Sequence, residues 1–136
     1  MWHAGIMDDA LQLDPDLLDA LVEQLRDAGA VFAFVHGSRA EGRHQPESDT
    51  DVAAWFGSDV DRFKLEAHLP AGVDLLVLDD APLELAGRVA MYGRLLFETD
   101  PAQRVEWQAT TRKIYLDERP RVERSRADFA ASRRDG

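Results

Sequence analysis

The sequence predicts a single domain of the α/β or α+β class, with a small mixed sheet of about four strands flanked by helices. Three observations lead to this prediction. The chain has 136 residues, a length that supports one hydrophobic core and leaves little room for a second. Short apolar runs rich in β-branched and aromatic residues alternate with segments of helical periodicity, as in folds that cover a sheet with helices. The chain has no cysteine, so neither disulfides nor thiolate zinc ligands contribute to the fold.

The first half of the chain predicts one helix followed by two strands. Asp14 is a typical N-cap before Pro15, and apolar residues then recur at helical spacing until Gly29, which ends the helix. The apolar run 31–36 lies between glycines, as is typical of a buried strand. A polar loop then leads to a second strand at 50–56.

The second half continues the alternation of helices and strands. The patterns predict a short helix at 59–69, a third strand at 73–78, a helix at 82–92, a fourth strand at 94–98 and a C-terminal helix at about 101–125. We therefore expect the domain to span residues 14–125, with an N-terminal tail at 1–13 and a flexible tail at 126–136.

Charge and hydropathy exclude several classes of function. The formal net charge is −10, with the surplus of acids in the first 100 residues and a mildly basic stretch at 101–136. Such a charge argues against direct nucleic-acid binding and favours a basic protein partner or bound cations. The sequence has no apolar run long enough to span a membrane, and its first residues do not resemble a secretion signal. We therefore expect no membrane association and a cytoplasmic location.

A glycine–serine pair followed by two aspartates is the motif on which the functional prediction depends. Gly37 and Ser38 follow the first strand, and Asp49 and Asp51 come at the start of the second. Glycine permits a sharp turn and close approach of a ligand, and free backbone N–H groups at a helix start, where we expect Ser38, favour phosphate. Two residues separated by one position in a strand project from the same face. The pair of carboxylates therefore outlines a site for Mg²⁺.

A third acid is expected to complete this cluster. Asp74 lies within the otherwise apolar run 73–78, so we expect its side chain to be buried. A buried carboxylate needs a metal, a base or a hydrogen-bonding network, and a metal shared with Asp49 and Asp51 meets that need. Two Mg²⁺ ions bridged by such acids would neutralise a triphosphate, activate an attacking hydroxyl and stabilise leaving pyrophosphate in an in-line displacement.

Plainer interpretations exist for single residues. Gly37 and Ser38 alone are typical of a strand-to-helix turn with a serine cap, and Asp49 or Asp51 alone of a turn or an edge strand. Neither interpretation explains an acid on the next apolar strand. Arg39 either reaches the triphosphate or lies exposed on a first helical turn. Three histidines lack the clustering of a zinc site and are predicted to be structural or solvated: His36, His44 and His68. Three aromatic residues are predicted to lie in the core or to contact a partner: Trp55, Phe56 and Trp107.

Residues 36–42 and 48–53 resemble the two halves of the nucleotidyltransferase superfamily signature, most closely that of the minimal nucleotidyltransferase (MNT) group, whose members pair with a HEPN-domain toxin. Residues 73–76 look like the strand that carries its third carboxylate, and residues 82–97 resemble the helix and strand that follow. The resemblance covers most of the chain. Glu41 departs from it mildly, because many relatives carry arginine or another residue there.

The resemblance implies a nucleotidyltransferase fold and a Mg²⁺-dependent antitoxin adenylyltransferase, an AMPylase that transfers AMP from ATP to a tyrosine hydroxyl of a HEPN ribonuclease toxin. It implies that Asp49 and Asp51 hold Mg²⁺ and that Asp74 completes the metal site and serves as, or assists, the base. It also implies that Gly37 and Ser38 grip the triphosphate, with the neighbouring Arg39 grouped with them as nucleotide-binding.

Two other functions compete with this one. The first is an antitoxin that neutralises its partner by binding alone, which the net charge of −10 suits because an RNA-cleaving partner should be basic. The second is a nucleotidyltransferase for a small-molecule alcohol or amine. The chain lacks a second domain to enclose such a substrate.

Overall fold

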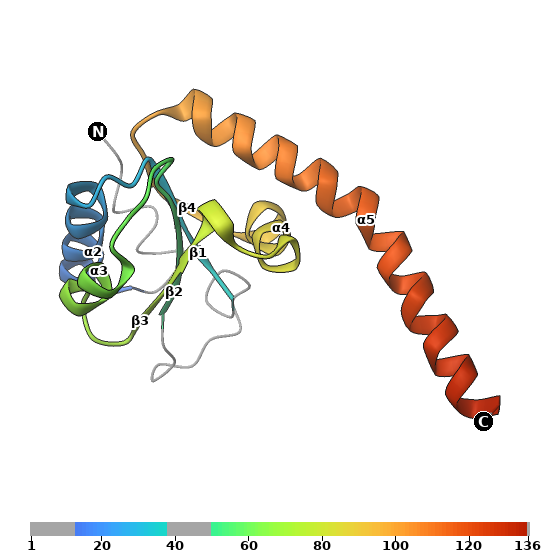
Figure 1. The fold of residues 1–136 in the computed structure, drawn as a ribbon. Coiled ribbons are helices and arrows are strands. Elements are labelled where there is room, and N and C mark those ends of the chain that lie inside the picture. Colours follow the sequence, from blue (N-terminus) through green and yellow to red (C-terminus); the bar gives the residue numbers. More distant parts are fainter. Residues whose placement is uncertain (1–12, 38–49, 136) are drawn as a thin grey trace.

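A four-stranded mixed sheet lies between two pairs of helices (Figure 1). The structure is a computed structural model. It describes the backbone of residues 13–37 and 50–135, and the side chains of these residues up to residue 118. The elements are α2 (Pro15–Asp27), β1 (Phe32–His36), β2 (Thr50–Trp55), α3 (Arg62–His68), β3 (Val73–Val77), the 3₁₀ turn η1 (Leu78–Asp80), α4 (Leu83–Tyr92), β4 (Arg94–Glu98) and α5 (Pro101–Asp135). The predicted order of elements is confirmed over these residues.

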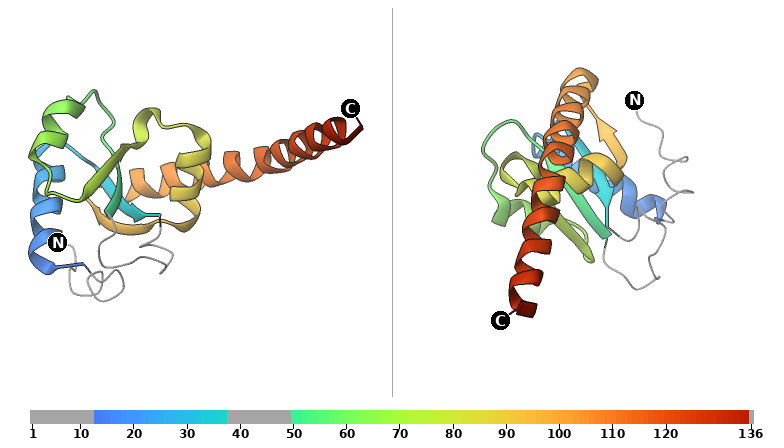
Figure 2. Two further views of the ribbon diagram at one scale, coloured as in Figure 1. Left: turned by 90° about the horizontal axis from the view of Figure 1, so that it is seen from below. Right: turned by 90° about the vertical axis from the view of Figure 1, so that its right-hand side faces the viewer.

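The strand order is β3-β2-β1-β4, so β3 and β4 are the edge strands. β1 pairs antiparallel with both β2 and β4, whereas β2 and β3 run parallel. The parallel pair requires a crossover, which α3 provides on one face of the sheet (Figure 2). This arrangement confirms the predicted mixed sheet.

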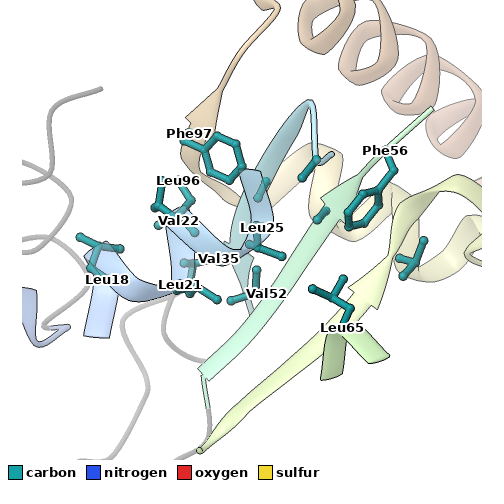
Figure 3. Packing of buried hydrophobic residues seen from close by; sticks show 14 of the residues in the cluster. Leu18, Leu21, Val22, Leu25, Val35, Val52, Phe56, Leu65, Leu96 and Phe97 are labelled. Carbon is teal, nitrogen blue, oxygen red and sulfur yellow. The ribbon is translucent and has the colours of Figure 1, made fainter. Parts of the chain in front are cut away.

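Alternation along the strands divides the core into two layers. On one face, side chains such as Val35 and Val52 pack against α2 and α3 (Figure 3). On the other face, Phe32, Phe34 and Ala53 pack with residues of α4 and with Trp107 of α5. Both core layers come from the same strands, because successive side chains of a strand point to opposite faces.

Aromatic rings fill the layer under α5. The Phe32 ring stacks on Trp55, with centroids 5.4 Å apart, and lies 5.4 Å from the Trp107 ring. Phe56 is buried in the other layer. Of the two predicted alternatives, core or partner contact, these contacts place Phe56 in the core and pack the partly buried Trp55 and Trp107 against it.

Local capping sets where the helices begin and where β2 ends. The Asp14 carboxylate accepts a hydrogen bond from Asp16 N at 2.9 Å, as the cap before Pro15 predicts. Asp61 caps α3 by accepting from Lys64 N at 3.0 Å, so this helix begins slightly later than expected. Asp79 of η1 accepts hydrogen bonds from Phe56 N and Gly57 N, which ties the turn after β2 to the end of β3.

The C-terminal helix is longer than the sequence suggested. It was expected to end near residue 125, but α5 continues to Asp135 and extends away from the sheet (Figure 1). A proline within a helix removes one backbone hydrogen bond, and the residues after Pro120 are largely good helix formers such as Arg, Ala and Glu. One lost bond therefore does not end the helix. None of the helices described is long and apolar enough to cross a membrane.

Two kinds of contact hold the first part of α5 against α4. Gln108 Nε2 and Arg112 Nε both donate to the Ala90 carbonyl, at 3.0 and 2.6 Å, near the C-terminus of α4. This satisfies a carbonyl of the last helical turn that otherwise lacks a partner. Gly87 lets the helices approach closely, because a Cβ built there would lie 2.1 Å from Cδ1 of Tyr115.

We predict that Gly87→Ala destabilises the protein by about 1–3 kcal/mol through overpacking. This is the reverse of the usual gain of about 0.5–1 kcal/mol for alanine over glycine in a helix. Urea unfolding measures the effect, and a Tyr115→Ala background serves as the control because it removes the clashing ring. Equal effects of Gly87→Ala in both backgrounds would contradict the packing argument.

Candidate active site

Three strands bring polar residues together at one end of the sheet, where β1 ends and β2 and β3 begin. In the strand register, His36 of β1 is opposite Asp51 of β2, and Asp51 is next to Asp74 of β3. The alternation that places Phe34, Ala53 and Leu76 on the α4 face places these three residues on the same face. The imidazole and the two carboxylates therefore form a row across neighbouring strands.

The two carboxylates of this row, Asp51 and Asp74, differ in exposure. Asp51 is partly buried, whereas Asp74 is exposed. The expectation that Asp74 is buried is therefore wrong. Asp74 stands near the start of an edge strand, where no further strand covers it, although its neighbours in the sequence are apolar. Its place beside Asp51, rather than the cost of burial, connects it with the site.

Gly37 holds the turn at the end of β1 against Asp51. Its φ of +72° is in the left-handed region that favours glycine. A Cβ at this position would lie 2.5 Å from Oδ2 of Asp51, which is far inside van der Waals contact. Close approach of a ligand was expected here, and in the structure a carboxylate oxygen of Asp51 lies in that space.

The other predicted site residues are not covered by the structure. Ser38, Arg39 and Asp49 lie outside the described residues. Gly37, Asp51 and Asp74 are described, and the fold brings them together although they come from three different strands or strand ends. The strand pairing therefore accounts for the positions of these three residues.

The described donors suit a hard divalent cation. Asp51 and Asp74 are neighbours on strands about 4.8 Å apart, so their carboxylates can approach one ion, and Mg²⁺ prefers carboxylate oxygens. Within 13–37 and 50–118, no group of three or more His, Asp or Glu side chains is placed to hold a metal. Asp49, the third ligand expected from the sequence, belongs to neither range.

His36 was predicted to be structural or solvated, yet it lies in the row of site residues. Burial is the main cause that lowers the pKa of its imidazole, and the Arg88 guanidinium lowers it further. The Asp51 carboxylate and a backbone hydrogen bond at Val52 oppose the shift. Burial thus favours the neutral form of the ring over the charged form. The strand period was the available signal, because His36 shares a face with Phe34 and comes directly before Gly37.

A small hollow of about 150 Å³ adjoins this row on the side of β1. Its wall is formed by the end of β1 and by one side of α4, with Arg88 near His36. The lining residues are His36, Gly37, Leu85, Arg88, Val89 and Tyr92. Apart from His36 and Gly37, none of them was singled out by the sequence motif.

The family comparison decides what kind of protein carries this site. The family described as "Polymerase beta, Nucleotidyltransferase" matches residues 20–102, more than half of the chain. The chain belongs to this nucleotidyltransferase family. The matched segment contains the three described site residues Gly37, Asp51 and Asp74 and all four strands. No curated protein matches the chain.

Solved structures share the fold of this nucleotidyltransferase. A chain of a toxin–antitoxin complex crystallised with AMP-PNP superposes with a TM-score of 0.69 and 22% identity, covering 83% of this chain and 98% of that one. A chain of the MntA–HepT toxin–antitoxin gives a TM-score of 0.66 and 20% identity, covering 86% and 99%. A chain of the complex of a tri-AMPylated Shewanella oneidensis HEPN toxin with its MNT antitoxin gives 0.63 and 20%, covering 84% and 96%.

We predict that Gly37→Ala weakens Mg²⁺-dependent ATP binding at least about tenfold, because the new Cβ displaces the Asp51 carboxylate and the left-handed backbone costs about 1–2 kcal/mol. Gly29→Ala is the matched control, since Gly29 also has positive φ but has no other atom within 4 Å of its Cβ position. Calorimetry of ATP binding and of unfolding separates the two effects. An equal loss of ATP affinity in both variants would contradict the role of Asp51.

A second prediction concerns the protonation of His36 in the metal-free protein. Its pKa lies below the ordinary histidine value of about 6.5. As the pH falls below about 6.5 the unfolded chain therefore binds the proton first, and folding stability falls until the pH reaches the lower folded-state pKa. Arg88→Gln should raise the His36 pKa, because it removes a cation that opposes protonation. NMR titration of the imidazole measures this, and an unchanged or lower value contradicts it.

Proposed function

We propose that this nucleotidyltransferase is an antitoxin adenylyltransferase, which transfers AMP from ATP to a tyrosine hydroxyl of a HEPN-domain toxin and thereby neutralises it. The observation that carries the proposal is the pairing of Asp51 with Asp74 beside the Gly37 turn. Family membership supports the reaction class. The solved complexes with AMP-PNP and with a tri-AMPylated HEPN toxin support the nucleotide and the acceptor.

In the proposed reaction, the tyrosine oxygen forms a bond to the α-phosphorus of ATP while the bond to the bridging oxygen of the leaving pyrophosphate breaks. Mg²⁺ held by Asp49, Asp51 and Asp74 would neutralise the triphosphate and polarise the reacting oxygens. Asp74 is exposed, so its carboxylate is accessible to an attacking hydroxyl and accepts its proton. The Gly37–Ser38 turn would bind phosphate oxygens through backbone N–H groups.

The charge of the chain fits the proposed partner. The net charge is −10, and a protein that binds and cleaves RNA needs a basic surface. Opposite charges on the two proteins would speed their association. This feature is also what a purely stoichiometric inhibitor would need, so it does not by itself separate catalysis from binding.

Neutralisation by binding alone is the second candidate, and α5 is the observation that favours it. Its described part exposes Val105, Ile114 and Leu116, with 45–51% of each side chain accessible. Exposed apolar side chains along a helix that leaves the body suit contact with another protein. An interface of this kind would act without nucleotide.

The two candidates differ in the response to Asp51→Asn and Asp74→Asn. With radiolabelled ATP, Mg²⁺ and a cognate HEPN-domain protein as acceptor, we expect each variant to slow labelling by about 10²-fold or more, because it removes a metal ligand or the proton acceptor. Asp27→Asn, an exposed acid at the end of α2, is the control and should label normally. Growth assays with the toxin measure neutralisation in parallel. No label from the wild-type protein, with the toxin still neutralised by Asp51→Asn, would establish binding alone.

A further inference from the structure

Arg88 is a cation that the motif does not account for. It lies exposed on α4 and lines the hollow beside His36 and Gly37. Within the described part of the chain it forms no ion pair, whereas Arg62 and Arg104 are paired with Asp80 and Glu98. A guanidinium that has no carboxylate partner among the described residues and lies beside an acidic site, in a chain of net charge −10, is placed to bind an anion.

The strand order places Arg88 on a particular side of the reaction centre. Asp74 is on β3, Asp51 on β2 and Gly37 at the end of β1. The helix α4 packs over β1, where Val89 joins Phe34 in one cluster. Arg88 therefore lies across Asp51 from Asp74.

In-line displacement assigns opposite roles to these two sides. The attacking and leaving oxygens lie on opposite sides of the phosphorus. If the attacking hydroxyl gives its proton to Asp74, the leaving group departs towards β1 and α4. Breaking the bond between the α-phosphorus and the bridging oxygen leaves the electron pair on that oxygen, so negative charge grows on the side of Arg88.

We propose that Arg88 and the hollow that it lines bind the β- and γ-phosphates of the nucleotide and hold the pyrophosphate as it leaves. This inference rests on the proposed nucleotidyl transfer. It gives Arg88 a direct role in binding and in stabilising the leaving group.

The chemistry and size of the hollow suit this ligand. The planar guanidinium matches phosphate oxygens and can donate two parallel hydrogen bonds. Leu85, Val89 and Tyr92 line the hollow beside it. A volume of about 150 Å³ is smaller than the roughly 300–1,000 Å³ of sites that enclose whole small molecules. It therefore suits the two terminal phosphate groups rather than the entire nucleotide.

The test compares nucleotides that differ only in their phosphates. Calorimetry with the full chain and Mg²⁺ gives the affinities for ATP, AMP and pyrophosphate in the wild type, Arg88→Gln and Arg88→Lys. We expect Arg88→Gln to weaken ATP and pyrophosphate binding by about 10- to 100-fold, the range for hydrogen bonds to charged groups, and to leave AMP affinity unchanged. Arg88→Lys should fall between, because it keeps the charge without the planar fork.

Arg26→Gln is the matched control, because Arg26 is an exposed arginine in the last turn of α2, on the opposite face of the sheet. It should leave all three affinities unchanged. Equal losses for AMP and ATP in Arg88→Gln, or no loss for either, would overturn the assignment while labelling of the toxin by the wild type still supported the proposed function. A wild-type protein that binds neither ATP nor pyrophosphate would overturn both. Thermal unfolding of each variant excludes loss of the fold.

Discussion

The pairing of β2 with two different neighbours is the constraint on which the rest of the site depends. β2 runs antiparallel to β1 and parallel to β3, which puts Asp51 between His36 and Asp74. Because the side-chain period of a strand is two, a slip of one residue in either pairing would move a carboxylate to the α2 face. The two apolar layers prevent such a slip, since it would also expose Val52 and bury Asp51 in the core.

The end of β1 carries a second constraint, which is steric. The space beside Gly37 is filled by the Asp51 carboxylate, so the turn and the acid hold each other in place. On the other side of this turn, α4 presents Arg88 and the apolar wall of the hollow. The position of α4 depends in turn on α5, through the close contact at Gly87 and the hydrogen bonds to the Ala90 carbonyl. Packing far from the carboxylates thus sets the position of the α4 residues that line the hollow.

Prediction from the sequence worked best where the signal was local. The cap at Asp14, the glycine turn after β1 and β4 at Arg94–Glu98 were all predicted from short patterns. Prediction failed where the exposure of a residue or the end of an element depends on its surroundings in the fold. Asp74 was expected to be buried because of the apolar residues on both sides of it, but an edge strand leaves it exposed. α5 continues beyond its predicted end near residue 125, because the helix formers after Pro120 outweigh the effect of one proline.

The sequence by itself determined the class of fold, the order of its elements and the motif of glycine and acids that predicts phosphate and metal chemistry. These follow from periodicity and residue type, which are properties of short segments. Only the tertiary structure decided the strand register that pairs Asp51 directly with Asp74, the place of His36 in the same row, and the position of Arg88 beside the end of β1. Such contacts join residues up to about 50 positions apart. Strand pairing and helix packing choose them, and both depend on segments that lie far apart in the chain.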